Sequence, residues 1–236
     1  MSRPGPKPTV VFLGGFRSDM TGTKAMALDI WAARSGFAFL RFDYFAHGGS
    51  SGDFEDATIG RWIDDARAVI GAIIPTGRLV LVGSSMGGWI MLNLVRHLRD
   101  RLVGLVGIAA APDFTQELIW PALSAADQAT LQRDGRLLRP SRYTPEPDIL
   151  TLQLIEEGAQ HLVLDQPLDL PCAIHLLHGT ADPEVPWQLS QRVLEHITAP
   201  DATLTLVKDG DHRLSQPSDI ERLTDIVERL CLSARP

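Results

Sequence analysis

Residues 79–89 read LVLVGSSMGGW, and this stretch decides the fold. Residues 79–82 have the length and apolar character of a buried β-strand, and residues 86–98 are expected to form an apolar helix. Between them, Gly83, Ser85 and Gly87 give the pattern G-x-S-x-G. Between a strand and a helix, this pattern makes a sharp turn that lifts the serine hydroxyl above the sheet edge. Ser85 is therefore the candidate nucleophile, and Ser84, which lies off the centre of the pattern, is the alternative.

Apolar runs alternate with amphipathic segments on both sides of this turn. Strands are expected over residues 9–13, 37–42, 79–82, 102–108, 173–177 and 203–207, and helices over residues 23–34, 58–74 and 86–98. This alternation predicts the α/β class, with a mainly parallel sheet of about six strands and helices on both faces. In such sheets, ligands bind beyond the carboxyl ends of the strands. Functional side chains are therefore expected in the loops that follow strands.

The alternation stops over residues 111–170, which carry short amphipathic pieces and no clear strand. A stretch of this length inside a compact domain is usually functional. A disordered insertion is the alternative, but apolar residues such as Trp120, Leu131 and Leu137 argue against it. We interpret residues 112–168 as a helical cap inserted into one domain that covers residues 1–236. Trp120 is a candidate for the substrate pocket.

A candidate general base follows the last expected strand. His212 lies there in the polar loop Lys208-Asp209-Gly210-Asp211-His212. Imidazole suits the role of general base because its unperturbed pKa lies near neutrality. The alternative is His47, in the loop after the second expected strand. His175 and His178, within and at the end of an expected strand, are interpreted as structural.

A candidate acid follows the fifth expected strand. Asp182 lies in a Gly- and Pro-rich loop, and Asp113 and Glu184 are the alternatives. The order along the chain is then Ser85, Asp182, His212, which is the nucleophile–acid–histidine order expected when G-x-S-x-G opens a helix in this sheet.

Stabilisation of the negative charge formed during acyl transfer requires two N–H donors. One is expected from Met86, which follows the nucleophile. The other is expected from Phe16 in the glycine-containing loop after the first strand, with Gly15 as the alternative. Trp187, beside the acid loop, is a second pocket candidate. This chemistry needs no metal ion and no organic cofactor.

The bulk composition narrows the possible partners. The net charge of −7 argues against nucleic acid. No apolar run approaches the roughly 20 residues that a membrane span needs, so no stable membrane insertion is expected. Residues 1–8 lack the apolar core of a secretion signal, and a cytoplasmic location is expected.

Several longer motifs resemble the α/β-hydrolase superfamily of serine hydrolases. The similarity is greatest to the branch of the animal mitochondrial palmitoyl-protein thioesterase, which also cleaves the acyl glucuronide of mycophenolic acid, and its bacterial relatives. The motifs are GFRSDM at residues 15–20 with GTKA at 22–25, RFDY at 41–44, GSSMGGW at 83–89, LHG at 177–179 with Asp182, VPW at 185–187, and DHR at 211–213. The resemblance implies that Ser85, Asp182 and His212 fall on the catalytic triad positions of that branch. Unlike the branch, this chain is expected to have no extended N-terminal targeting segment, and its cap is only loosely similar.

We therefore expect a serine hydrolase that cleaves carboxylic esters or thioesters with an apolar acyl group through an acyl-enzyme. The substrate is expected to be a small-molecule ester or acyl thioester, and an acylated protein is a further candidate. The alternatives are a hydrolase of C–C or other bonds on the same fold, and a receptor that keeps the three residues without catalysis.

Overall fold

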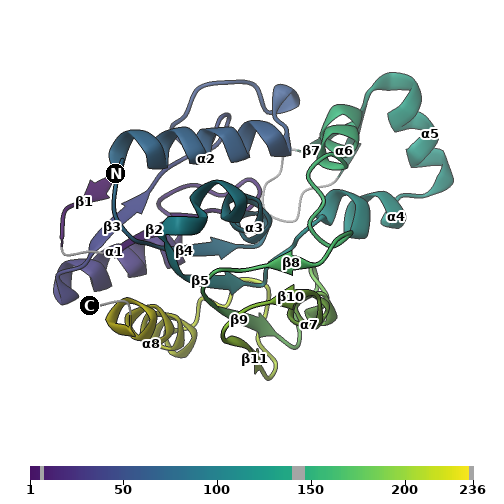
Figure 1. The fold of residues 1–236 in the computed structure, drawn as a ribbon. Coiled ribbons are helices and arrows are strands. Elements are labelled where there is room, and N and C mark those ends of the chain that lie inside the picture. The colour runs from purple at the N-terminus through teal and green to yellow at the C-terminus, as the bar shows by residue number, and fades with distance from the viewer. Residues whose placement is uncertain (6–7, 140–146, 234–236) are drawn as a thin grey trace.

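The computed structural model describes residues 1–5, 8–139 and 147–233. Its central sheet has seven strands in the order β1-β3-β2-β4-β5-β9-β11 (Figure 1). Their bounds are β1 (Ser2–Arg3), β2 (Thr9–Leu13), β3 (Ala38–Arg41), β4 (Leu79–Ser84), β5 (Leu102–Ile108), β9 (Ala173–Gly179) and β11 (Ala202–Val207). All neighbouring strands from β3 to β11 are parallel, which confirms the predicted mainly parallel α/β sheet.

A seventh strand, β1, lies at the sheet edge and was not expected from the sequence. It is two residues long and antiparallel to β3, with Ser2 opposite Leu40. A segment this short has no periodicity from which pairing could be predicted. The six expected strands are all present.

Helices cover both faces of the sheet and bury two separate apolar clusters. One face carries α1 (Thr23–Ser35) and α8 (Pro217–Ser233). The opposite face carries α2 (Ile59–Ile73), α3 (Met86–Leu98) and α7 (Trp187–His196). In Figure 1, α2 and α3 accordingly lie on the opposite side of the sheet from α8. Among the described residues, no helix has the length and apolarity needed to cross a bilayer.

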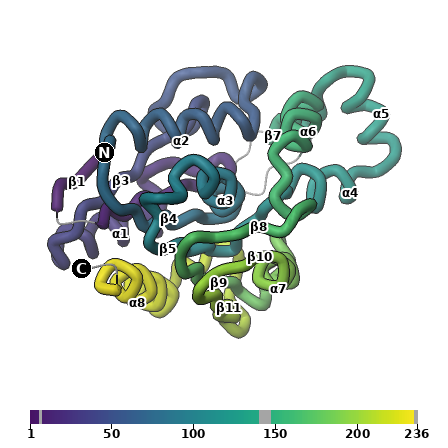
Figure 2. Tube along the Cα trace, in the orientation of Figure 1, coloured from purple at the N-terminus to yellow at the C-terminus, as the bar shows by residue number. Residues whose placement is uncertain are grey.

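The segment between β5 and β9 projects from the sheet and carries α4, α5 and α6 (Figures 1 and 2). It contains a π-helical turn η3 (Thr115–Ile119), then α4 (Trp120–Ala122), α5 (Ala125–Asp134), β6 (Arg136–Arg139), β7 (Asp148–Thr151), α6 (Leu152–Gly158) and β8 (Leu168–Asp169). Of the predicted cap, residues 140–146 lie outside the described residues.

The expectation that this segment has no strand is wrong. β6 and β7 form an antiparallel pair, and β8 pairs in parallel with β10 (Ile197–Thr198). These strands have only two to four residues, and β6, β7 and β10 lie next to helices in the chain. Alternation of apolar and polar residues becomes a strand signal only over about four to eight residues.

Candidate functional site

The turn between β4 and α3 holds Ser85 in a backbone conformation that residues with a side chain seldom adopt. Its φ is 53° and its ψ is −118°. The Ser85 N–H donates to the Ile108 carbonyl at 2.9 Å, which ties the turn to the end of β5. A Cβ atom on Gly87 would lie 2.1 Å from the Leu13 carbonyl oxygen, so α3 approaches β2 this closely only with glycine there. Ser84, the alternative nucleophile, is buried at the end of β4.

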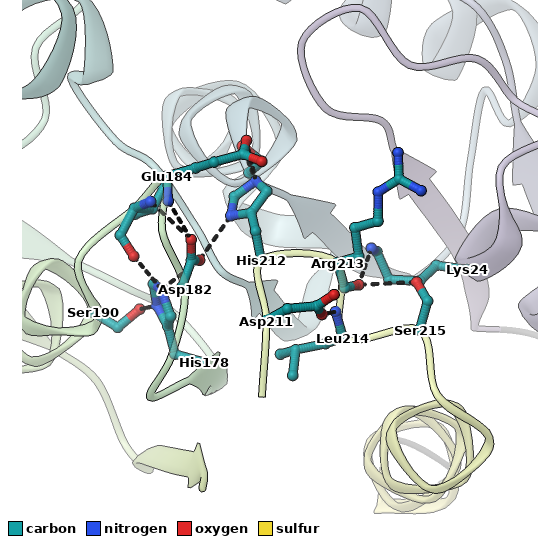
Figure 3. Close-up of polar contacts among 12 residues, drawn as sticks. Lys24, His178, Asp182, Glu184, Ser190, Asp211, His212, Arg213, Leu214 and Ser215 are labelled. Carbon is teal, nitrogen blue, oxygen red and sulfur yellow. Dashed lines mark hydrogen bonds and ion pairs between the residues drawn. The ribbon is translucent and has the colours of Figure 1, made fainter. Parts of the chain in front are cut away.

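Three loops at the carboxyl ends of β4, β9 and β11 bring Ser85, Asp182 and His212 together. The Nε2 atom of His212 lies 3.2 Å from the Ser85 Oγ atom. The Nδ1 atom of His212 lies 2.7 Å from Asp182 Oδ2, as drawn in Figure 3. The imidazole therefore lies between a hydroxyl and a carboxylate, in the geometry required for a base that is oriented by an acid.

The loops after β9 and β11 are fastened to each other. The Thr180 N–H donates to Val207 O at 2.9 Å, and the Ala181 N–H donates to Gly210 O at 3.0 Å. A Cβ atom on Gly179 would lie 2.1 Å from Gly210 O, so a side chain there would separate the loops. The relative position of Asp182 and His212 is thus set by backbone contacts.

Asp182 is almost completely enclosed, with 1% of its side chain exposed. Its Oδ1 atom accepts hydrogen bonds from the N–H groups of Glu184 and Val185 at 2.8 and 2.9 Å. Burial alone would raise the pKa of Asp182, but the hydrogen bonds from His178, His212 and Val185 stabilise the anion and hold the pKa well below its usual range. The carboxylate therefore stays charged at neutral pH.

His178 also contacts Asp182, which the sequence reasoning missed. It lies at the end of β9, fully buried, with Nε2 at 3.1 Å from Asp182 Oδ2 and Nδ1 at 2.7 Å from the Ser190 Oγ atom of α7. The only sequence signal for this contact is that His178 and Asp182 are four positions apart. A tight loop after a strand can bring a loop side chain back to the last residues of that strand.

Neither alternative acid occupies the acid position. The Oε2 atom of Glu184 lies 3.7 Å from Nε2 of His212, on the serine side of the ring. The buried carboxylate of Asp113 instead accepts hydrogen bonds from the N–H groups of Val163 and Leu164. Burial raises the pKa of Asp113 to about 6. Asp113 therefore joins the end of β5 to the returning arm of the inserted segment.

His47, the alternative base, supports the loop after β2. Its Nε2 atom accepts the Arg17 N–H at 3.1 Å, and its Nδ1 atom lies 3.0 Å from the Phe45 carbonyl oxygen. Arg17 has a φ of 55°, so the bond holds a turn that is unfavourable for a residue with a side chain. Burial lowers the pKa of His47 and keeps the ring in the neutral form that accepts this bond.

This loop brings backbone donors close to the serine. An ideal Cβ atom on Gly15 would lie 3.4 Å from the Cβ atom of Ser85. The Phe16 ring packs edge-on against the rings of Phe54, Trp62 and Phe114, which fixes the loop from the other side. The N–H groups of Phe16 and Met86 remain candidate donors for a negatively charged oxygen.

The two tryptophan candidates lie on different elements. Trp120 begins α4 and packs against the main apolar cluster, and Trp187 begins α7 directly after the acid loop. Both are half-buried. A cavity of about 500 Å³ lies elsewhere, between α2, α3 and α6, and its lining includes Arg61, Arg96 and Glu157. Among the described residues, no cluster of three or more His, Cys, Asp or Glu side chains could hold a metal ion.

The model of the alpha/beta hydrolase family matches residues 10–225. The chain belongs to the alpha/beta hydrolase family. The palmitoyl-protein thioesterase ABHD10, mitochondrial, of Mus musculus is 36% identical over 233 residues, which cover 96% of this hydrolase and 77% of the mouse protein.

Two solved structures are also similar to this alpha/beta hydrolase. The crystal structure of an Agrobacterium vitis S4 protein is 45% identical, with a TM-score of 0.93 over 98% of this chain and 91% of that chain. The structure of alpha/beta hydrolase domain-containing protein 10 from mouse is 34% identical, with a TM-score of 0.90 over 100% of this chain and 94% of that chain. These similarities confirm the α/β-hydrolase fold and the resemblance to the thioesterase branch.

Proposed function

We propose that this hydrolase cleaves carboxylic esters and thioesters with an apolar acyl group, with Ser85 as nucleophile, His212 as base and Asp182 as the acid that orients the base. The observation that carries the proposal is the pair of contacts made by one imidazole, 3.2 Å to the Ser85 hydroxyl and 2.7 Å to the Asp182 carboxylate. The name of the mouse relative, a palmitoyl-protein thioesterase, supports the choice of bond.

In the first half-reaction, Ser85 Oγ attacks the acyl carbon while its proton passes to Nε2 of His212. The carbonyl oxygen becomes an oxyanion, which accepts hydrogen bonds from the N–H groups of Met86 and Phe16, or of Gly15 in place of Phe16. Collapse of the oxyanion breaks the bond to the leaving oxygen or sulfur. His212 returns the proton to that atom, which leaves as an alcohol or thiol, and the acyl group remains on Ser85.

In the second half-reaction, water takes the place of the leaving group. His212 accepts a proton from this water, and the hydroxide attacks the acyl carbon of the acyl-enzyme. When the new oxyanion collapses, the bond to Ser85 Oγ breaks, and His212 returns the proton to that oxygen. Asp182 keeps the proton of the neutral imidazole on Nδ1 throughout and stabilises the imidazolium that forms twice in each cycle.

We propose that residues 112–168 act as a cap within one domain of residues 1–236, and that this cap selects the acyl group. Trp120 in the cap and Trp187 beside the acid loop are the apolar residues proposed to contact it. A small-molecule ester or acyl thioester is the proposed substrate, and an acylated protein is a second candidate because of the name of the mouse relative. That name also includes a mitochondrial location, so the cytoplasmic location stays a prediction.

A fluorophosphonate tests the nucleophile directly, because it phosphonylates only a serine that is activated by a neighbouring base. We expect labelling at Ser85 alone, located by intact mass and peptide mapping, and loss of both labelling and esterase activity in Ser85→Ala. The matched control is Ser84→Ala, which should still be labelled. Labelling that persists in Ser85→Ala would refute the assignment, and an unlabelled wild-type protein would favour a receptor.

A further inference from the structure

The carboxylate of Asp182 is shared between two histidines. Its Oδ2 atom lies 2.7 Å from His212 Nδ1 and 3.1 Å from His178 Nε2 (Figure 3). The second contact is made away from solvent, because the side chain of His178 is fully buried. The Asp182 oxygen that contacts His212 is therefore also contacted by the ring of His178.

The neighbours of His178 determine where its proton lies. Nε2 lies 2.9 Å from the Val185 carbonyl oxygen as well as 3.1 Å from Asp182 Oδ2, and both of these oxygens can only accept. Nε2 must therefore carry a proton and donate it. Nδ1 lies 2.7 Å from the Ser190 hydroxyl, which donates to it when the ring is neutral. The ring of His178, on β9, is thus held by three partners, two in the acid loop and one on α7.

We propose that His178 is a positioning residue, whose Nε2–H donates a second hydrogen bond to Asp182 Oδ2 and thereby limits how tightly this carboxylate holds a proton on His212. Two donors to one oxygen compete for its electron density. Without the His178 donor, Asp182 Oδ2 would be a stronger acceptor for the Nδ1–H of His212. The protonated form of His212 would then be more stable, and its pKa would rise. This inference rests on the proposed function, because it assigns a role relative to the catalytic base.

The other titratable groups near this pair come from two directions. Glu184, with Oε2 at 3.7 Å from His212 Nε2, lies on the far side of the imidazole ring. On the histidine loop itself, the Arg213 carbonyl oxygen accepts a hydrogen bond from the Lys24 Nζ atom of α1, and Asp211 accepts the Leu214 N–H (Figure 3). These groups are unchanged by substitution of His178, so they do not alter the comparison between its variants.

A pair of amide variants separates the hydrogen bond from the volume of the ring. In His178→Gln, the side-chain NH₂ reaches about as far as Nε2 and restores a donor to Asp182. In His178→Asn, it reaches only about as far as Nδ1, so Oδ2 loses that donor. We expect the acid limb of the kcat/KM profile to move up by about one pH unit in His178→Asn, the order expected for one hydrogen bond to a charged group. In His178→Gln, the limb should return to the wild-type position.

Controls and a direct measurement complete the test. His175→Asn changes another histidine of β9, which contacts Thr203 and Thr205 instead of the site, and should leave the limb in place. In ¹⁵N-histidine-labelled wild-type protein, NMR should find the His178 proton on Nε2 throughout the titration of His212, a readout that does not depend on any variant folding.

An acid limb that is the same in the Asn and Gln variants, whether shifted or not, would overturn the inference, as would a His178 proton found only on Nδ1. Activity that survives Ser85→Ala would instead refute the proposed function, so the two failures are distinguishable.

Discussion

At the scale of the residue, Asp182 is the most constrained group in the site. Each of its oxygens has two donors nearby: two backbone N–H groups at Oδ1 and two histidine rings at Oδ2. A carboxylate with these partners cannot rotate without losing several charge-assisted hydrogen bonds at once. The orientation of His212 therefore follows from that of Asp182.

Replacement of Asp182 by Asn should lower kcat by roughly 10³–10⁴, the scale seen when a triad histidine takes the wrong tautomer. The variant should still fold, because the change is nearly isosteric. The matched control is Asp113→Asn, which also alters a buried carboxylate held by backbone N–H groups but has no contact with His212. Steady-state kinetics and circular dichroism of both variants provide the measurement. A mild loss in Asp182→Asn beside a large loss in Asp113→Asn would move the acid to Asp113.

The pH–rate profile should lose activity as pH falls through the range in which imidazole ordinarily gains a proton, because a histidine base accepts the serine proton only in its neutral form. Asp182 cannot produce this limb, since its pKa is lowered and it stays ionised there. Asp113 could, because its pKa is raised to about 6 and it gains a proton over the same range. We therefore expect the limb to persist in Asp113→Asn. A profile without an acid limb in Asp113→Asn would show that the limb comes from protonation of Asp113.

That Ser85, Asp182 and His212 would lie close together could be predicted from the sequence, because each follows an expected strand and parallel strands bring their carboxyl ends to one sheet edge. It did not identify the contacts of His178, because strand alternation gives the face of a residue but not its partner. The ties from Asp113 to Val163 and from Arg17 to Asp148 were also unpredictable. Each joins residues 50 or more positions apart, across a segment whose path the sequence did not reveal.

At the scale of the element, the turn from β4 into α3 depends on a close approach between backbones. α3 begins directly above the end of β2, where the missing Cβ of Gly87 leaves room for the Leu13 carbonyl. The boundaries of α3 are those expected from the sequence, residues 86–98, because an apolar helix beginning after a G-x-S-x-G turn has an unambiguous start. The π-helical turn η3 and the β6–β7 pair had no comparable signal.

Substitution of Gly87 by Ala should therefore destabilise the protein, toward the upper end of the roughly 1–3 kcal/mol typical of overpacking, or beyond it. It should also lower kcat, because Ser85 and the Met86 N–H move with the helix start. The matched control is Gly71→Ala in α2, where an added Cβ meets nothing within 4 Å. That change should stabilise the helix by about 0.5–1 kcal/mol. Urea unfolding of both variants is the measurement, and equal effects would contradict the close approach.

At the scale of the whole molecule, two of the contacts that join the inserted segment to the rest of the chain lie beside the candidate site. Asp113 joins the end of β5 to Val163 and Leu164, and Arg17, directly after Phe16, forms an ion pair with Asp148 of β7 at 3.2 Å. The Arg17 guanidinium also lies 4.0 Å from the centroid of the Phe54 ring. The segment is thus attached near the end of β5 and at the loop after β2. A cap attached in this way would form the wall of the acyl site, so its apolar residues should determine chain-length preference.

The last prediction tests this arrangement with substrates. If the cap forms an apolar acyl site, each methylene buried there contributes about 0.8 kcal/mol. The value of kcat/KM for 4-nitrophenyl esters should then rise by up to about fourfold per methylene until the site is full, and Trp187→Ala should flatten the rise. Matched thioesters should follow the same series. Anilides should react far more slowly, because their leaving amine must be protonated and no residue is assigned to that step. Rates that fall steadily from acetate to palmitate would mean that the cap forms no acyl site, and anilides that match esters would contradict the esterase assignment itself.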